Sequence, residues 1–318
     1  LDTIARAGQV LDLTAAVDRA AWSAATTSEV TVGNRLWAVP LTKYLVGIAY
    51  DVATFQRAKL AGPPKTWSDL GTAFAALKKL DAIPEATAVK DGSLIYYSFM
   101  GLASTVLGPA GFAALLAGNR RLDDADLVAV LDQLVAWSDS YQKKPEASTY
   151  LEARTLFTTG QAASIVASTI DLAGYASVAP GRKLGFFPWP ASDAAHDPLA
   201  NRGLASLFAV NAATADPAAA LGFARWLGSP PAAQIALDPL NLLPALDGVT
   251  PRGSGNALTT SLLAVPADVP VWHEQPLLAG LPQVWGQSGP NLITKKLSSA
   301  DFAKSLQADV DKRRSGSG

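Results

Sequence analysis

Few residues in this chain have the type and spacing that catalysis requires. Asp171 and Glu274 are carboxylates, but nothing in the sequence pairs them as the two carboxylates of a hydrolytic site. His273 is adjacent to Glu274 rather than one helical turn away, which argues against a metal site. The motifs G-x-S-x-G, H-E-x-x-H, G-x-x-x-x-G-K-[ST] and G-x-G-x-x-G are absent. We therefore expect no enzyme activity, no cofactor and no metal.

The composition excludes further classes of chemistry and partner. The chain has 318 residues, enough for two domains with a core each, and a formal net charge of -1. It has no polybasic block that would hold a nucleic acid or an anionic membrane surface. Cysteine is absent, which excludes disulfides and thiolate ligands. No apolar run is long enough to span a bilayer, and no signal peptide is visible at Leu1.

The elements that must position any site are clearest between Gly33 and Leu70. The pattern predicts a turn at Gly33-Asn34 and a short apolar strand over 36–39. It also predicts that Pro40 ends this strand, and that a second apolar strand runs over 44–50.

Two helices are predicted in the rest of this segment. The first carries Ala53, Phe55 and Leu60; the second opens with Thr66-Trp67-Ser68-Asp69, a hydroxyl N-cap with an acidic residue in the first turn. The order of these elements resembles the crossover segment of the extracellular solute-binding proteins of ABC importers. The resemblance is to the sugar- and oligosaccharide-binding group, which is maltose-binding-protein-like.

The resemblance continues along the chain. Phe157, Gly160, Ala162 and Ala163 match a family motif, but 168–171 read Ser-Thr-Ile-Asp where the family often has an aromatic residue, so we expect hydroxyl and carboxylate contacts there. Other matching segments are 184–190, 202–210, the helix 217–227, the Pro-Ala turn at 242–245 and two closing helices over 281–311.

The resemblance implies a fold and a division into lobes. The fold is α/β and of the two-lobed periplasmic-binding-protein type (type II), in which each lobe is a mixed sheet wrapped by helices. The expected limits are 1–38 with 206–255 for lobe 1, 43–200 with 265–318 for lobe 2, and hinge crossings near 39–42, 201–205 and 256–264.

Both ends of the sequence depart from the family pattern. Residues 1–14 resemble a segment that normally follows two to three strand-helix units, so we expect lobe 1 to lack its front strands. The last four residues, Ser-Gly-Ser-Gly, have the composition of a flexible linker. An engineered binding scaffold or biosensor module is therefore one alternative reading, and a carbohydrate-active hydrolase is a second.

The resemblance also implies a sugar site, which needs flat aromatic rings and fixed hydrogen-bonding groups. The residues expected to reach the ligand are Tyr44, Tyr96, Tyr97, Ser168, Thr169, Asp171, Trp189, Arg202, Asn241, Trp272 and Trp285. For Tyr44, Tyr96 and Trp189, the alternative to ligand contact is packing in the core or in a loop. For Arg202, the alternative is an ion pair with Asp171 or with Asp197. Trp22, Trp67, Trp137 and Trp226 are predicted to be core residues.

The function implied by the resemblance is capture of a sugar or oligosaccharide and its delivery to ABC permease subunits. The protein would be periplasmic or extracellular, with a lipoprotein anchor, outside this chain, as an option. We expect a monomer with no nucleic-acid partner.

Overall fold

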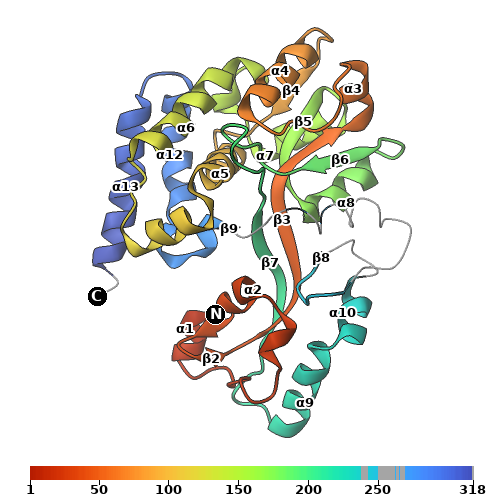
Figure 1. Ribbon diagram of the computed structural model, residues 1–318, viewed down its shortest axis with the longest axis vertical. Coiled ribbons are helices and arrows are strands. Elements are labelled where there is room, and N and C mark those ends of the chain that lie inside the picture. The colour runs from red at the N-terminus through yellow and green to blue at the C-terminus, as the bar shows by residue number, and fades with distance from the viewer. Residues whose placement is uncertain (238–242, 250–261, 263–264, 266–268, 317–318) are drawn as a thin grey trace. The chain divides into compact units, whose positions relative to one another are not determined.

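The computed structural model describes residues 1–237, 243–249, 262, 265 and 269–316, and the chain forms two compact units. Unit 1 comprises Leu1–Leu45 and Arg202–Ala264, and unit 2 comprises Val46–Asn201 and Val265–Gly318. Each unit combines helices with strands (Figure 1), which confirms the predicted α/β class.

Unit 1 is built from short elements. Gly33, with a φ of +63°, begins a two-residue turn between β1 (Thr31–Val32) and β2 (Arg35–Leu36), so the predicted turn is confirmed. The other elements are α1 (Asp2–Arg6), α2 (Ala24–Ser28), the first part of β3 (Val39–Asp51), most of β7 (Asn201–Phe208), α9 (Pro217–Leu227), α10 (Pro230–Leu237) and β8 (Leu243–Pro244).

Strand β3 corrects the predicted break at Pro40. Val39–Asp51 is one strand of 13 residues that passes from unit 1 into unit 2 after Leu45. Pro40 is tolerated because it is the second residue of the strand, where a missing N–H costs least. Its carbonyl accepts a hydrogen bond of 3.1 Å from the indole N–H of Trp22.

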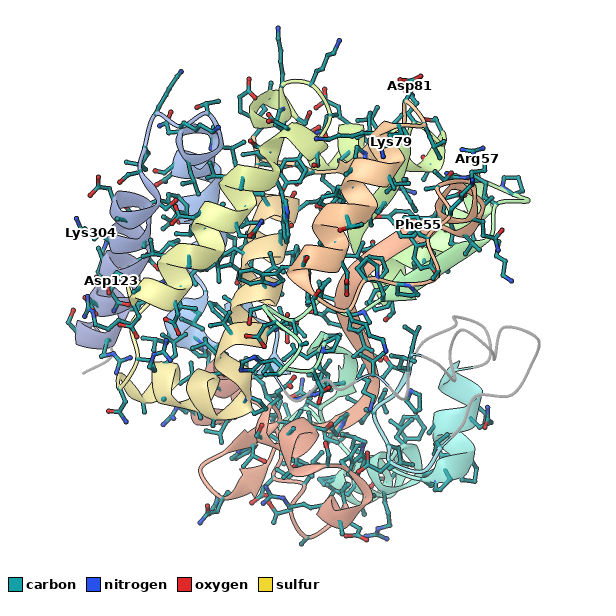
Figure 2. All side chains as sticks on the ribbon, turned by 45° about the horizontal axis from the view of Figure 1, so that its top comes forward. Phe55, Arg57, Lys79, Asp81, Asp123 and Lys304 are labelled. Carbon is teal, nitrogen blue, oxygen red and sulfur yellow. The ribbon has the colours of Figure 1, made fainter. Side chains whose placement is uncertain are left out.

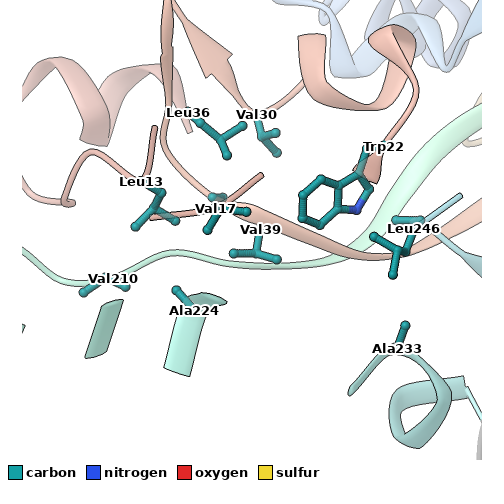
Figure 3. Packing of buried hydrophobic residues seen from close by; sticks show 12 residues of the cluster. Leu13, Val17, Trp22, Val30, Leu36, Val39, Val210, Ala224, Ala233 and Leu246 are labelled. Carbon is teal, nitrogen blue, oxygen red and sulfur yellow. The ribbon is translucent and has the colours of Figure 1, made fainter. Parts of the chain in front are cut away.

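The core of unit 1 surrounds Trp22, which is 4% exposed (Figure 3). Leu13, Val17 and Val39 pack in the same cluster, together with Leu246 from the segment after β8. The core therefore joins residues from both stretches of chain that make up the unit.

Helix α9 has a second apolar side that is open to solvent. Ala224 is fully buried, whereas Phe223 and Trp226 are 48% and 44% exposed, with their rings stacked at 5.6 Å between centroids. The prediction that Trp226 is a core residue is therefore wrong. The helical period turns Ala224 toward the core and leaves its two aromatic neighbours on the adjacent side.

A mixed sheet forms the centre of unit 2. Strands β4 (Ile83–Ala86) and β5 (Ala162–Ser168) are parallel, and β5 pairs antiparallel with the second part of β3. On its other side this part of β3 pairs antiparallel with β6 (Leu184–Phe187), so that Ile48 lies opposite both Val166 and Phe187.

Helices cover this sheet, and α4 begins where the sequence predicts. The helices of unit 2 are α3 (Val52–Arg57), α4 (Trp67–Lys78), α5 (Ser93–Ala117), α6 (Ala125–Ala136), α7 (Tyr150–Thr158), α8 (Thr169–Val178), α12 (Leu281–Ile293) and α13 (Ser299–Ser315). Thr66 and Asp69 form a reciprocal capping box at the start of α4. Figure 2 shows Phe55 and Arg57 on α3; Phe55 packs against Tyr50, whereas Arg57 is exposed.

Helix α5 corrects the expectation that no apolar run is long enough to span a bilayer. By length and composition alone, this helix of 25 residues is long and apolar enough to cross a membrane. The backbone departs from helical geometry at Gly108, just before Pro109. Helix α5 also packs against β5, α6 and α12, and 56% of its apolar window is buried. These contacts identify α5 as the core helix of unit 2.

Candidate ligand-binding site

Two tyrosines and a histidine meet in unit 2. Tyr96 and Tyr97 lie near the start of α5, and both rings contact His273, which lies in the 3-10 turn Trp272–Glu274. The centroid separations are 5.6 Å between the tyrosines, 5.7 Å from Tyr96 to His273 and 5.5 Å from Tyr97 to His273. Tyr96 is 1% exposed, but Tyr97 is only half-buried, so the ring of Tyr97 is the accessible one.

Asp91 fixes the start of α5 beside the start of α7. One carboxylate oxygen accepts from the backbone N–H and the hydroxyl of Ser93, at 3.1 and 2.7 Å. The other accepts from the backbone N–H of Tyr150 at 2.9 Å. Because two helix starts share one carboxylate, the side chains of Tyr97 and Tyr150 come from neighbouring positions.

Asp171 joins a third helix start to this group. It forms a capping box with Ser168 at the start of α8, and Oδ2 accepts from the Ser168 N–H and hydroxyl at 2.9 and 2.8 Å. Its Oδ1 accepts from the hydroxyl of Tyr150 at 3.2 Å. The Tyr150 hydroxyl also lies 3.5 Å from that of Tyr175, which is buried. Asp171 therefore orients Tyr150 and still has free lone pairs on Oδ1.

The electrostatics around Tyr97 link it to both carboxylates. Burial raises the pKa of Tyr97 to about 12, and the negative charges of Glu274 and Asp171 add to this effect. Burial lowers the pKa of His273, which is therefore neutral at pH 7. We refer to the set Tyr96, Tyr97, Tyr150, Asp171, His273 and Glu274 as the Tyr97 cluster.

One buried polar atom of the Tyr97 cluster, Nδ1 of His273, lacks a hydrogen-bond partner among the described residues. The hydroxyl of Tyr96 is buried beside the backbone N–H of His273. A buried polar atom normally finds a partner in protein, water or ligand, because leaving it unpaired is costly. An aromatic ring, two carboxylates and an unpaired polar atom suit a ligand with apolar faces and many hydroxyls.

The structure brings five of the predicted site residues together in this part of unit 2. Tyr96, Tyr97 and Asp171 belong to the Tyr97 cluster, and Ser168 and Thr169 begin α8 beside Asp171. Thr169 and Tyr96 are buried, whereas Ser168, Asp171 and Tyr97 are partly exposed.

The three predicted tryptophans are core residues instead. Trp189 is 1% exposed and lies so close to α5 that a Cβ at Gly101 would come within 2.0 Å of its ring. Trp272 is fully buried and donates to Ser104 at 2.9 Å, and Trp285 is fully buried against Phe302. None of these rings has a face open to a ligand, which corrects the prediction for all three.

The remaining predicted residues belong to unit 1 or lie outside the described residues. Arg202 is 4% exposed and forms a buried ion pair with Glu29, so both predicted pairings, with Asp171 and with Asp197, are wrong. Tyr44 is half-buried over β7, where a Cβ at Gly203 would come 2.4 Å from its ring. Asn241 and most of the predicted crossing 256–264 lie outside the described residues.

Sequence reasoning missed Tyr150 and Tyr175. The only local signal for Tyr150 is its place after Thr149, which forms a capping box with Glu152. Tyr175 is one turn beyond Asp171 on α8, a spacing that places both on one helical face. The starts of α5, α7 and α8 are brought together by tertiary packing, which the local sequence does not indicate.

A pocket of about 910 Å³ lies elsewhere in unit 2, along β4 and α7. Its lining includes Ile83, Tyr141, Leu151 and Leu156, and it contains none of the predicted site residues.

A comparison with protein-family models identifies the family of the chain. A sequence model of the family "bacterial extracellular solute-binding protein" matches residues 1–261. A search of curated protein sequences finds no match.

Solved structures match almost the whole chain. A chitin oligosaccharide binding protein is 22% identical with a TM-score of 0.80, and the match covers 98% of this chain and 81% of that one. The putative binding protein msme from Bacillus subtilis is 19% identical, with a TM-score of 0.82 and coverage of 99% and 82%. A sugar transporter from Bacillus licheniformis in complex with stachyose is 17% identical, with a TM-score of 0.76 and coverage of 98% and 83%. These likenesses confirm the predicted two-lobed α/β fold.

Proposed function

Because the chain belongs to the bacterial extracellular solute-binding protein family, we propose that it captures a sugar or an oligosaccharide for an ABC importer. Relatives of the same fold are described as binding chitin oligosaccharides, and one is in complex with stachyose. Their identities are low, so the sugar class rests on the site as much as on the relatives.

The observation that carries the proposal is the Tyr97 cluster. Sugar rings present apolar C–H faces that stack on aromatic rings and hydroxyls that pair with carboxylates. The half-buried ring of Tyr97 would supply the stacking face. Oδ1 of Asp171, and the hydroxyl oxygen of Tyr150 that donates to it at 3.2 Å, would accept hydrogen bonds from ligand hydroxyls.

The division into lobes and the hinge are also part of the proposal. We retain 1–38 with 206–255 and 43–200 with 265–318 as the lobes, with crossings near 39–42, 201–205 and 256–264. A hinge motion between the lobes would close the protein on its ligand. Tyr44, half-buried on β3 in unit 1, stays a candidate contact.

The family is extracellular, and its members are binding proteins. We propose that this chain acts without catalysis, as a monomer, and delivers its ligand to permease subunits in the membrane. A lipoprotein anchor would keep it near that permease.

Calorimetry with raffinose, stachyose and chitotriose tests the proposal, with product analysis to detect turnover. We expect saturable binding of at least one sugar and no product. Tyr97→Ala should weaken binding by roughly 1–3 kcal/mol. The control Trp226→Ala removes an exposed aromatic ring from unit 1 and should leave affinity unchanged. Absence of binding to every sugar, or release of product, would overturn the proposal.

A further inference from the structure

A small internal cavity lies beside α5 in the core of unit 2. Its volume is about 10 Å³, and every residue that lines it is at most 9% exposed, so it lies inside the protein. Most of the lining is apolar, but four of the lining side chains carry a polar group: Glu85, Ser98, Tyr141 and Trp189. We refer to this space as the Glu85 cavity.

The indole of Trp189 brings an unpaired hydrogen-bond donor to the Glu85 cavity. Trp189 is 1% exposed, and its Nε1 has no hydrogen-bond partner among the described residues. A Cβ at Gly101 would come 2.3 Å from Nε1, so this edge of the indole faces α5 at Gly101. Ser98 and Leu102, which line the cavity, lie on α5 within one turn of Gly101. The indole N–H therefore lies at the wall of the cavity.

The carboxyl group of Glu85, on β4, is a second polar group without a partner. Glu85 is 4% exposed, and its carboxyl group forms no salt bridge or hydrogen bond with the residues that the structure describes. Burial raises its pKa to about 8, so at pH 7 the carboxyl group carries its proton and can both donate and accept. Leaving such a group and a buried N–H unpaired would cost free energy for each.

The size and polarity of the Glu85 cavity restrict what can fill it. A volume of about 10 Å³ is roughly what one water molecule requires, and a water also needs about two to four polar partners. The indole N–H of Trp189 and the carboxyl group of Glu85 supply two partners. The hydroxyl of Ser98 donates to the carbonyl of Leu94 at 3.2 Å and still has lone pairs that can accept. The cavity therefore has the volume and the polar groups for one water and no room for a larger ligand.

We propose that the Glu85 cavity binds one structural water molecule, which accepts from the indole N–H of Trp189 and hydrogen-bonds to the carboxyl group of Glu85. The water satisfies two buried polar groups that the protein itself leaves unpaired. It joins β4 to the segment that follows β6, two parts of unit 2 that are far apart in the sequence.

Nuclear magnetic resonance of the whole chain tests the proposal at the indole N–H of Trp189. A long-lived water in contact with this proton gives cross-peaks to water of opposite sign in NOESY and ROESY spectra, whereas chemical exchange gives the same sign in both. We expect opposite signs for Trp189. Trp22 is the control, because its N–H donates to the carbonyl of Pro40 at 3.1 Å, and it should show no cross-peak to water.

Variants of the lining residues identify the partners of the water. Glu85→Gln keeps a polar group of the same size without a rapidly exchanging proton, and should keep the cross-peak. Glu85→Met has a similar length but no strong hydrogen-bonding group, and should lose it. Ser98→Ala and Tyr141→Phe remove the other rapidly exchanging hydroxyl protons of the lining and should leave the cross-peak in place.

A missing cross-peak at Trp189 in the unmodified protein, or one of equal sign in the two spectra, would overturn the proposal. This measurement needs no variant, so it decides the matter even where a substitution impairs folding. Loss of the cross-peak in Glu85→Gln, Ser98→Ala or Tyr141→Phe would assign it to a hydroxyl proton and would also overturn the proposal. A cross-peak that survives Glu85→Met would show that the carboxyl group does not hold the water, against the proposal.

Discussion

Glu85 is a carboxyl group held inside the core of unit 2. It is 4% exposed and lines a very small cavity with Trp137, Tyr141 and Trp189. No lysine or arginine among the described residues forms a salt bridge with it. Burial alone raises the pKa of Glu85 from 4.5 to about 8.

This pKa predicts a loss of stability as the pH rises from 4.5 to about 8. In the unfolded state Glu85 loses its proton above pH 4.5, whereas in the native state it keeps the proton up to a pH of about 8. Between these two pH values the native state therefore binds one proton more than the unfolded state. The free energy of unfolding should fall by about 1.4 kcal/mol per pH unit across that window. Urea unfolding at several pH values measures this slope. Glu85→Gln should flatten the slope, and an unchanged slope in this variant would contradict the assignment.

Asp171 has two roles that one substitution removes together. Asp171→Ala deletes the capping box at Ser168 and the acceptor of the Tyr150 hydroxyl. We expect a loss of about 1 kcal/mol of stability from the cap, and a loss of roughly 1.5–3 kcal/mol in sugar binding. Calorimetry and thermal unfolding give the two quantities separately.

A matched control isolates the cap. Asp301→Ala removes the corresponding acidic residue at the start of α13, where Ser298 is the N-cap. This variant should lose stability without losing affinity. Equal effects on affinity in the two variants would remove Asp171 from the site.

At the scale of elements, the packing of Trp189 against α5 depends on Gly101. A Cβ at this position would come within 2.0 Å of the indole ring. Gly101→Ala should therefore destabilise the protein by roughly 1–3 kcal/mol, although alanine favours helix more than glycine does. On α9, a Cβ at Gly222 would meet nothing within 4 Å. Gly222→Ala should then stabilise by about 0.5–1 kcal/mol, and denaturant unfolding of both variants checks the opposite signs.

Local signals explain most of the elements that were predicted correctly. The capping residues Thr66 and Asp69 predicted the start of α4, and the resemblance to the family predicted α9 with the bounds that the structure has. Local rules failed where tertiary contacts override them. Pro40 is part of β3 because it is the second residue of the strand, where the missing N–H costs little. Its carbonyl accepts a hydrogen bond from the indole N–H of Trp22.

The candidate site was less predictable than the fold, for a physical reason. Tryptophans near prolines, such as Trp189 and Trp272, have the same sequence signature whether they stack on a ligand or fill a core. The difference depends on packing against α5, which is distant in sequence. Tyr97 and Asp171 were predicted, but their connection through Tyr150 depends on three helix starts that meet only in the folded unit.

For the whole molecule, ligand binding should appear as added stability. A sugar present at a hundredfold excess over its dissociation constant should contribute about 2.7 kcal/mol. Scanning calorimetry should show this as a rise in the transition temperature that increases with sugar concentration. A sugar that binds in titration but leaves the transition unmoved would indicate comparable binding to the unfolded chain.

The exposed ring on α9 has a spectroscopic consequence. Of the eight tryptophans, Trp226 alone is more than a third exposed, while Trp22, Trp189, Trp272 and Trp285 are each at most 4% exposed. Iodide should therefore quench the red-shifted emission of Trp226 more strongly than that of the partly exposed Trp37 and Trp67, and Trp226→Phe should remove the most strongly quenched component. Because Trp226 lies in unit 1, its emission reports on that unit by itself. The protein carries an intrinsic fluorophore that can follow the unfolding of one unit while calorimetry records both.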